Sequence, residues 1–320
     1  MISIFHSRIK KTRKYRKKHK LFTALKLIIV ILLGAGVFTI GKAVTKDILV
    51  DIEIKSFKDR AVFEYEENYE YQTNVFQTRR YYKVPRETSY ELNDTRSVFY
   101  DETRKYLGQT GDIFMSQESP FPDVFFVHQF ISYYFGGHAA LKTDDNRFIE
   151  AVGFPDSDET LWDIISHDGS LPHDYSVTIS KTSSNYFLNP RYRAEGSEFY
   201  DYFGSYYREK FIGVRVKNVT EEQFNGAVQY ADQLVGENLY NFLFFLDMEY
   251  KYYCTDLVSR AYQDVMVPEN EQANYAKALN DDGFITSVND IILSEETYIA
   301  FYVEIIDEVV HIYYLEDVEG

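Results

Sequence analysis

One cysteine, one histidine and one glutamate carry the clearest chemical signal in this 320-residue chain. Cys254, in the stretch YKYYCTDLVSRAY, is the only cysteine. Apolar residues follow it at helical spacing as far as Val265, and Pro268 lies beyond, so we predict a helix that Cys254 opens. The backbone N–H groups and positive dipole at a helix start favour a thiolate, which makes Cys254 a candidate nucleophile. The alternative is that Cys254 is a small buried residue on the apolar face of a core helix, which fits the same pattern.

His138 is the candidate base for this thiol. It follows Gly136-Gly137 and begins the strand-like piece HAALKT, so its side chain can face a cleft at a sheet end. A neutral imidazole can take the thiol proton and later deliver it to a leaving amine. Glu150 ends the next strand-like piece, where a carboxylate can accept the other imidazole N–H and fix the tautomer. A structural histidine beside a surface glutamate is the alternative.

The order of these segments resembles the permuted branch of the NlpC/P60 papain-like superfamily, the YiiX-like hydrolases and their lecithin:retinol acyltransferase relatives. The matching pieces are GDIFMS, GGHAALKTDDNRFIEAVG, FIGVRVKNVTEEQFNGAVQYADQLVGENLYNF and YYCTDLVSRAYQ. In that branch the histidine strand precedes the cysteine helix. The resemblance implies Cys254 as nucleophile, His138 as general base and acid, and Glu150 as the third polar residue. It also implies an α+β papain-like fold, with an antiparallel sheet packed on helices.

The first 46 residues predict a membrane anchor. Nine cations lie between Arg8 and Lys20 before any acid appears, and the apolar stretch Leu21 to Ile40 is long enough to cross a bilayer. A basic N-terminal flank favours a cytoplasmic N-terminus and an extracellular C-terminal body. No small-x-small cleavage site follows, so we expect a single-pass signal anchor in the cell membrane rather than a cleaved signal peptide. The predicted boundaries are a basic cytoplasmic tail at 1–20 and a transmembrane helix at 21–42.

The remainder of the chain is strongly acidic. Residues 1–46 hold twelve of the 34 Lys and Arg and no acid, so 22 cations face 50 carboxylates beyond them. This charge argues against nucleic acid as a partner, and against binding to anionic lipid away from the anchor. A lone cysteine forms no internal disulfide, so the stability of the exported domain must come from its hydrophobic core.

The exported part divides at about residue 104. Residues 43–104 mix charge and aromatics and predict a mostly helical stem or flanking subdomain, broken near Pro85. Residues 105–320 form the predicted papain-like domain. Strand-like pieces lie at 111–116, 138–143, 147–153, 176–181 and 211–217, and a helix starts at the capping box of Thr220 and Gln223.

An insertion at about 155–210 separates the histidine strands from the cysteine helix. It is polar, aromatic and rich in loops, and its length suggests a wall or lid of a site. His167 and His173 lie within it beside two aspartates, but their spacing matches no strong zinc pattern, and we expect a polar loop there.

These observations lead to a functional hypothesis. We expect a membrane-anchored extracellular cysteine hydrolase of the amidase or peptidase type, cleaving an amide bond in a substrate such as cell-wall peptide, with no metal or organic cofactor. An acyl-lipid hydrolase or acyltransferase is one alternative. A noncatalytic surface module that binds a ligand in the same cleft is another, and a scaffold that contacts a membrane assembly through residues 47–104 is a third.

Overall fold

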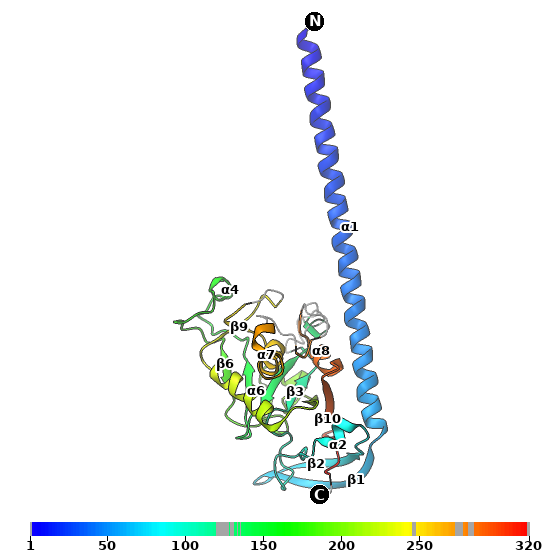
Figure 1. The fold of residues 1–320 in the computed structure, drawn as a ribbon, viewed down its shortest axis with the longest axis vertical. Helices are drawn as coiled ribbons and strands as arrows, with labels where there is room; N and C mark the ends of the chain where they lie inside the picture. The colour runs from blue at the N-terminus through cyan, green and yellow to red at the C-terminus, as the bar shows by residue number, and fades with distance from the viewer. Residues whose placement is uncertain are drawn as a thin grey trace. The chain divides into compact units, whose positions relative to one another are not determined.

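The computed structural model divides the chain into two compact units, residues up to Asp47 and residues from Ile48 onward. Figure 1 shows its helices and strands in chain order. The structure describes residues 2–119, 128, 131–132, 134, 136–244, 248–272, 278–280 and 285–318. The side chains of residues 2–19 and 21 are outside this description.

Helix α1, Ile2–Asp59, crosses the boundary between the two units. The part up to Asp47 makes up the first unit, and the part from Ile48 belongs to the second. From Phe22 onward α1 is long and apolar enough to cross a membrane. Its apolar side chains are exposed; Val37, for example, is 72% exposed. A core helix would bury such side chains, so this surface fits the predicted anchor at 21–42.

The second unit is built on a nine-stranded sheet, and the α+β class predicted from the sequence is confirmed. The strand order is β1-β2-β11-β10-β7-β3-β4-β5-β6, and every neighbouring pair is antiparallel except β2 and β11. The strands are β1 Val62–Gln72, β2 Val75–Val84, β3 Ile113–Ser116, β4 His138–Lys142, β5 Phe148–Ala151, β6 Ile179–Lys181, β7 Lys210–Val216, β10 Thr297–Ile306 and β11 Val309–Leu315.

The predicted strand-like pieces at 111–116, 138–143, 147–153, 176–181 and 211–217 correspond to β3 to β7. A second, two-stranded parallel sheet pairs β8, Leu239–Tyr240, with β9, Lys251–Tyr252. The helical segments are α2 Ser89–Asn93, α4 Leu161–Ser166, α5 Tyr200–Phe203, α6 Glu221–Gln233, α7 Cys254–Met266, the 3₁₀ turn η1 Glu269–Glu271 and α8 Val288–Leu293.

The mostly helical stem predicted for 43–104 is wrong in its secondary structure. After α1 ends, β1 and β2 form a hairpin, and β2 joins the main sheet by parallel pairing with β11. Charges that obscured these strands lie opposite one another across the hairpin, where Glu66 faces Arg80 and forms an ion pair with it. Cross-strand pairs of opposite charge stabilise a sheet, so a high charge content is compatible with strands here.

Helices α6 and α7 lie against each other, and α7 also contacts β4 and β5 (Figure 1). The capping box predicted at the start of α6 is confirmed: the Thr220 side chain accepts from the Gln223 N–H, and the Gln223 side chain accepts from the Thr220 N–H. The predicted cysteine helix is confirmed as α7, which begins at Cys254 and ends before Pro268.

An aromatic cluster holds the insertion at 155–210 against the sheet. The ring of Phe114 on β3 lies 4.8 Å from Phe148 on β5, 4.8 Å from Phe187 in the insertion and 4.9 Å from Phe301 on β10. Gly213 on β7 leaves room for Phe301, because a Cβ there would lie 1.9 Å from that ring. The insertion is therefore packed into the hydrophobic core.

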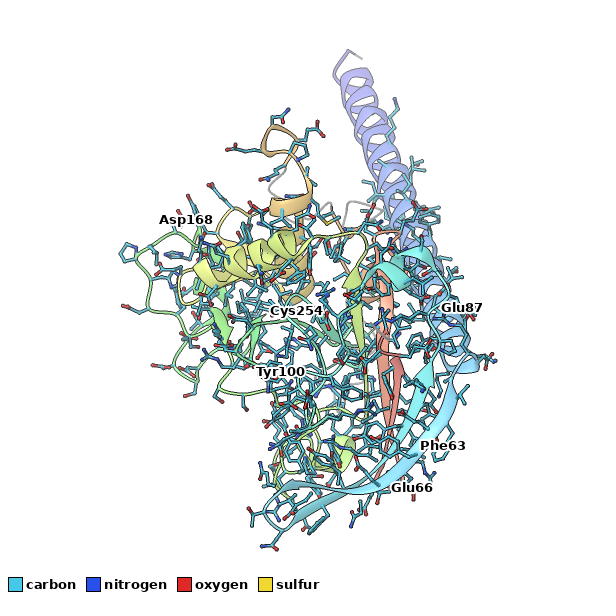
Figure 2. The ribbon with its side chains drawn as sticks, turned by 60° about the horizontal axis from the view of Figure 1, so that its bottom comes forward. Phe63, Glu66, Glu87, Tyr100, Asp168 and Cys254 are labelled. Carbon is cyan, nitrogen blue, oxygen red and sulfur yellow. The ribbon has the colours of Figure 1, made fainter. Side chains whose placement is uncertain are left out.

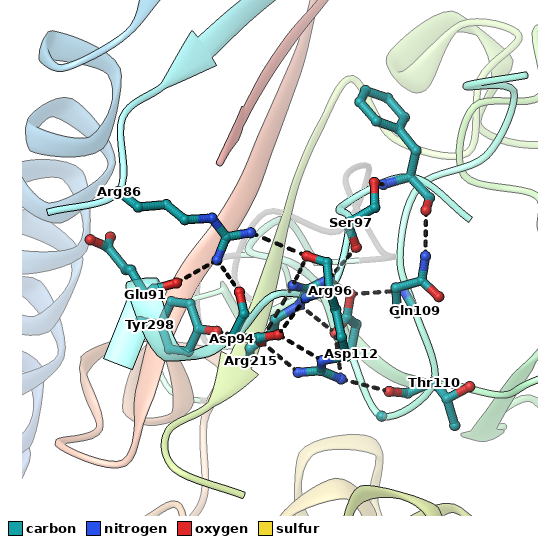
Figure 3. A network of polar contacts seen from close by, with 12 residues as sticks. Arg86, Glu91, Asp94, Arg96, Ser97, Gln109, Thr110, Asp112, Arg215 and Tyr298 are labelled. Carbon is teal, nitrogen blue, oxygen red and sulfur yellow. Dashed lines mark hydrogen bonds and ion pairs between the residues drawn. The ribbon is translucent and has the colours of Figure 1, made fainter. Parts of the chain in front are cut away.

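A buried network of charges joins β3, β7 and the segment after β2 (Figure 3). The Arg215 side chain is fully buried, and its Nε and Nη2 donate to the two Asp112 carboxylate oxygens at 2.8 and 3.1 Å. Its Nη1 reaches Asp94 Oδ2 at 3.3 Å, and Tyr298 Oη donates to the same oxygen at 2.6 Å. Burial would raise the pKa of Asp94, but Arg96 and Arg215 hold that pKa well below its ordinary value.

Asp112→Asn tests how far the fold depends on this network. The substitution keeps the shape but leaves the buried Arg215 cation short of a carboxylate, so we expect it to lower the free energy of unfolding by about 3 kcal/mol. The measurement is chemical unfolding of the full chain in detergent micelles, followed by near-UV circular dichroism. Glu66→Gln, at the exposed ion pair with Arg80, is the control and should leave the midpoint within error. Equal effects of the two substitutions would contradict the assignment.

Candidate active site

Strands β4 and β5 bring His138 and Glu150 together. Leu141 pairs with Ile149 in their antiparallel register. Continuing that register sets Ala140 opposite Glu150, so His138 is the diagonal neighbour of Glu150 on the same face of the sheet. His138 Nε2 lies 2.7 Å from Glu150 Oε2. The carboxylate therefore fixes the orientation of the imidazole, as the sequence pattern predicts.

The backbone before His138 is held in place by two glycines. Gly136 has a φ of +79°, which a residue with a side chain rarely adopts. Gly137 donates its N–H to the Ser116 carbonyl oxygen at 2.9 Å. A Cβ at Gly137 would lie 1.8 Å from the Glu118 carbonyl oxygen, so only glycine allows this approach. His138 thus starts β4 at a fixed position at the end of the sheet.

Cys254 is the first residue of α7 and is partly buried. Figure 2 labels it near the middle of the view. The residue before it, Tyr253, has an extended backbone and caps the helix with no side-chain hydrogen bond. Cys254 lies near enough to His138 to contribute to the raised pKa of its imidazole. Glu150 contacts Nε2 of this ring, so Nδ1 is the nitrogen that Glu150 leaves free to face the sulfur. All three residues predicted from the sequence therefore meet in one place.

These three residues line a cleft of about 450 Å³. The segment predicted as a wall or lid supplies much of its surface, including Tyr186, Tyr192, Phe203, Tyr207 and Arg208. The floor is polar where the Cys–His–Glu group lies, whereas the walls are largely aromatic. A cleft of this size and lining can hold part of a peptide or an acyl chain next to the sulfur.

The charges of His138 and Glu150 stabilise each other. Burial would lower the pKa of the His138 imidazole, but Tyr207, the Glu150 carboxylate and the Cys254 sulfur, which can accept from the imidazolium, raise that pKa well above its ordinary value. Burial would raise the pKa of Glu150, but the His138 charge and hydrogen bonds from His138 and Tyr186 lower it. Both shifts favour the pair of imidazolium and carboxylate over the neutral pair.

Two tyrosines complete the site: Tyr186 has no distinctive signal in the sequence, whereas Tyr240 lies in one of the segments that carry the family resemblance. Tyr186 Oη donates to Glu150 Oε2 at 2.7 Å, and burial together with the Glu150 charge raises the pKa of Tyr186, so this phenol stays neutral. Tyr240 on β8 pairs with Tyr252 on β9, two residues before Cys254. Burial and then the charge of Cys254 raise the pKa of the Tyr240 hydroxyl well above its ordinary value, so it too remains a hydrogen-bond donor.

The second histidine group in the insertion lies away from this cleft. His173 Nε2 is 2.9 Å from the Glu237 carbonyl oxygen, and His167 Nδ1 accepts from the Gly169 N–H at 2.9 Å. Asp168 extends from an outlying loop in Figure 2 and is exposed. Within the described part of the chain, no three His, Cys, Asp or Glu residues gather as metal ligands would.

The ion pair predicts a definite dependence of stability on pH. The pKa of His138 is raised in the folded chain. Its contribution to the free energy of unfolding is therefore complete below the ordinary histidine pKa and is lost as pH rises through the raised pKa. Glu150, whose pKa is lowered, contributes above the ordinary glutamate pKa, and its contribution is lost as pH falls through the lowered value. Both contributions are complete between about pH 4.5 and 6.5.

Glu150→Gln should therefore lower the free energy of unfolding by about 2 kcal/mol near pH 6, the scale of a hydrogen bond between charged groups. The loss relative to the unmodified chain should shrink at a pH high enough to deprotonate His138. Thermal unfolding of the full chain in micelles at a series of pH values measures both effects. Glu195→Gln, at an exposed position in the insertion, is the control, and a pH-independent loss at position 150 would refute the ion pair.

Comparisons with known proteins give no independent information on the function of this site. No family model matches the chain, and comparisons with curated proteins and with solved structures likewise found no match. The observations that bear on function are therefore the thiol–imidazole–carboxylate group, the cleft that holds it and the apolar helix α1.

Proposed function

We propose that the protein is a membrane-anchored thiol hydrolase that cleaves an amide bond, with Cys254 as nucleophile, His138 as general base and acid, and Glu150 as the residue that orients the imidazole. The observation that carries this proposal is that Cys254, His138 and Glu150 line one cleft, with His138 Nε2 2.7 Å from Glu150 Oε2. An ordinary core cysteine has no need of a buried imidazolium. A thiol nucleophile does, because the imidazolium stabilises the thiolate beside it.

The reaction proceeds through a thioester. His138 holds the proton of the Cys254 thiol, and the sulfur attacks the carbonyl carbon of the substrate. The carbonyl oxygen becomes an oxyanion, which the Cys254 N–H at the start of α7 and the Tyr240 hydroxyl can stabilise. The C–N bond then breaks as His138 gives its proton to the leaving amine.

Water completes the cycle. His138, now neutral, takes a proton from a water molecule, whose oxygen attacks the thioester carbon. The C–S bond breaks, the acid product leaves, and the proton on His138 restores the resting pair. Glu150 remains a carboxylate throughout. Its role is to hold the imidazole in one tautomer and stabilise its charge, while Tyr186 holds the carboxylate.

The proposed fold family is the permuted papain-like branch of the NlpC/P60 superfamily. Support comes from the chain order of the histidine strand β4 and the cysteine helix α7, and from the contacts of α7 with β4 and β5. The proposed location is the cell membrane, with the basic tail in the cytoplasm and the second unit outside. An extracellular amidase near a membrane would meet cell-wall peptides, which we propose as substrate.

An acyl-lipid hydrolase is the second candidate. The aromatic walls of the cleft favour it, with Phe154, Phe199 and Phe203 among the lining residues, as does an apolar helix that can hold the chain at a bilayer. The same three residues would perform the same chemistry on an ester. Parallel turnover assays with wall peptides and with acyl lipids in micelles distinguish the two substrates.

Alkylation of the single cysteine tests the proposal before any substrate is known. The full chain in micelles is treated with iodoacetamide between about pH 5 and 9, the range in which histidine and cysteine ordinarily titrate, and modification of Cys254 is followed by mass spectrometry. Because the imidazolium stabilises the thiolate, the unmodified chain should react at least about tenfold faster at pH 6 than His138→Ala.

His173→Ala is the matched control, because it removes a histidine outside the cleft and should leave the rate unchanged. Equal rates for the unmodified chain and His138→Ala, or a thiol that reacts only after denaturation, would refute the nucleophile assignment. A noncatalytic binding module makes a different prediction for Cys254→Ser, which should then keep ligand binding and biological activity, whereas a hydrolase should lose turnover by orders of magnitude.

A further inference from the structure

Two arginines lie in the cleft beside the Cys–His–Glu site, and neither has a carboxylate partner among the described residues. Arg193 and Arg208 both come from the insertion and both line the cleft. Every hydrogen bond that they donate within the described structure goes to a backbone carbonyl oxygen. The cleft therefore contains two cations beyond His138, in a domain whose overall charge is strongly negative.

The side chain of Arg193 has a structural role within the insertion. Its Nη1 donates to the carbonyl oxygens of Gly204 and Tyr206 at 3.1 and 2.6 Å, and its Nη2 reaches that of Tyr207 at 3.4 Å. These bonds tie the loop at 193 to the segment before β7. Arg193 thus holds the wall of the cleft in shape and contributes positive charge.

The side chain of Arg208 does not have such a set of structural hydrogen bonds within the described residues. Its side chain is 4% exposed, and its one hydrogen bond within the described structure runs from Nη1 to the Tyr207 carbonyl oxygen at 2.8 Å. Its Nε is buried and has no acceptor. A buried donor without a partner is costly, and most such groups in native structures have a ligand, a water molecule or a function that accounts for them.

Two rings hold the Arg208 guanidinium in the cleft. Its central carbon lies 4.1 Å from the Phe203 ring centroid and 4.4 Å from that of Tyr207. The Tyr207 ring in turn lies 6.3 Å from the His138 ring, so one aromatic side chain separates the cation from the imidazole. Phe203 and Tyr207 restrict where the guanidinium can move, while its Nε–H is left without an acceptor.

We propose that Arg208 binds a carboxylate of the substrate, so that the hydrolase selects amides whose acyl or amine portion carries that anion close to the scissile bond. This inference rests on the proposed function and specifies its substrate class. The Nε and Nη2 edge of a guanidinium presents two parallel N–H groups, which match the two oxygens of a carboxylate. A binding site for an anion also needs local cations here, since the acidic body would otherwise repel such a substrate.

Binding of small carboxylates tests the inference without requiring turnover. Titration calorimetry on the full chain in micelles compares hippurate and N-acetylglycine with their primary amides, which differ only in the charge. We expect at least one acid to bind about tenfold more tightly than its amide, the scale of one charge-assisted contact. Arg208→Gln should abolish this preference, and Arg208→Lys should retain part of it, because lysine keeps the charge but loses the paired donors.

Arg80→Gln is the control for net charge, since Arg80 lies on β2 and outside the cleft, and it should leave the preference unchanged. Circular dichroism establishes that each variant is folded. No preference for either acid, or a preference that survives Arg208→Gln, would overturn the inference. Tighter, Arg208-dependent binding of phenyl phosphate than of hippurate would overturn the choice of a carboxylate and assign the subsite to a phosphate.

A reactive pair of probes separates failure of the subsite from failure of the nucleophile. N-iodoacetylglycine and N-iodoacetylglycinamide both alkylate a thiol with loss of iodide, and their rate ratio on glutathione gives the reference. On Cys254 the acid should be favoured about tenfold over that reference, and Arg208→Gln should remove the advantage. If the amide reacts readily but the acid gains nothing, the subsite fails and the thiol chemistry stands. If neither probe reacts but hippurate binds through Arg208, the nucleophile fails and the subsite stands.

Discussion

The hydrogen bond between His138 and Glu150 is the interaction on which the candidate site depends. It forms because two short antiparallel strands place the two side chains diagonally on one face, at a Nε2 to Oε2 separation of 2.7 Å. An imidazolium buried alone would lose its proton, and a carboxylate buried alone would gain one. Each group keeps its charge because the other is present. The resulting cation is what makes a thiol beside it chemically different from the thiol of a core cysteine.

The rest of the second unit can be understood as support for that pair. The glycines before β4 fix where His138 begins its strand, and the small β8–β9 sheet brings Tyr240 close to the start of α7. Figure 3 shows the Arg215 network, which ties β3 and β7 to the loop after β2. The sheet is therefore fixed both by this buried charge and by the aromatic packing of the insertion against Phe114 and Phe148.

Some of the strands, helices and site residues could be predicted from the sequence alone, and others could not. The strands β3 to β7 have β-branched and aromatic residues in short runs, and the capping box at Thr220 marks α6. Cys254, His138 and Glu150 could be predicted because each lies at the end of such an element. The β1–β2 hairpin was mistaken for helix, because opposite charges such as Glu66 and Arg80 meet only once the two strands lie side by side. Tyr186 and Arg208 could not be found, because their roles arise from how a long irregular insertion packs.

The parallel pairing of β2 with β11 has a consequence for how the protein is made. Thr78 pairs with Val309 and Val84 with Leu315, so a strand near the start of the second unit pairs with β11, more than 220 residues later in the sequence. Contacts between residues so distant in sequence form late, because the loop between them must close first. During synthesis β2 has only β1 beside it until the C-terminal strands emerge. The β2 edge of the sheet can therefore be completed only after β11 has been synthesised, which makes this pairing a late step in folding.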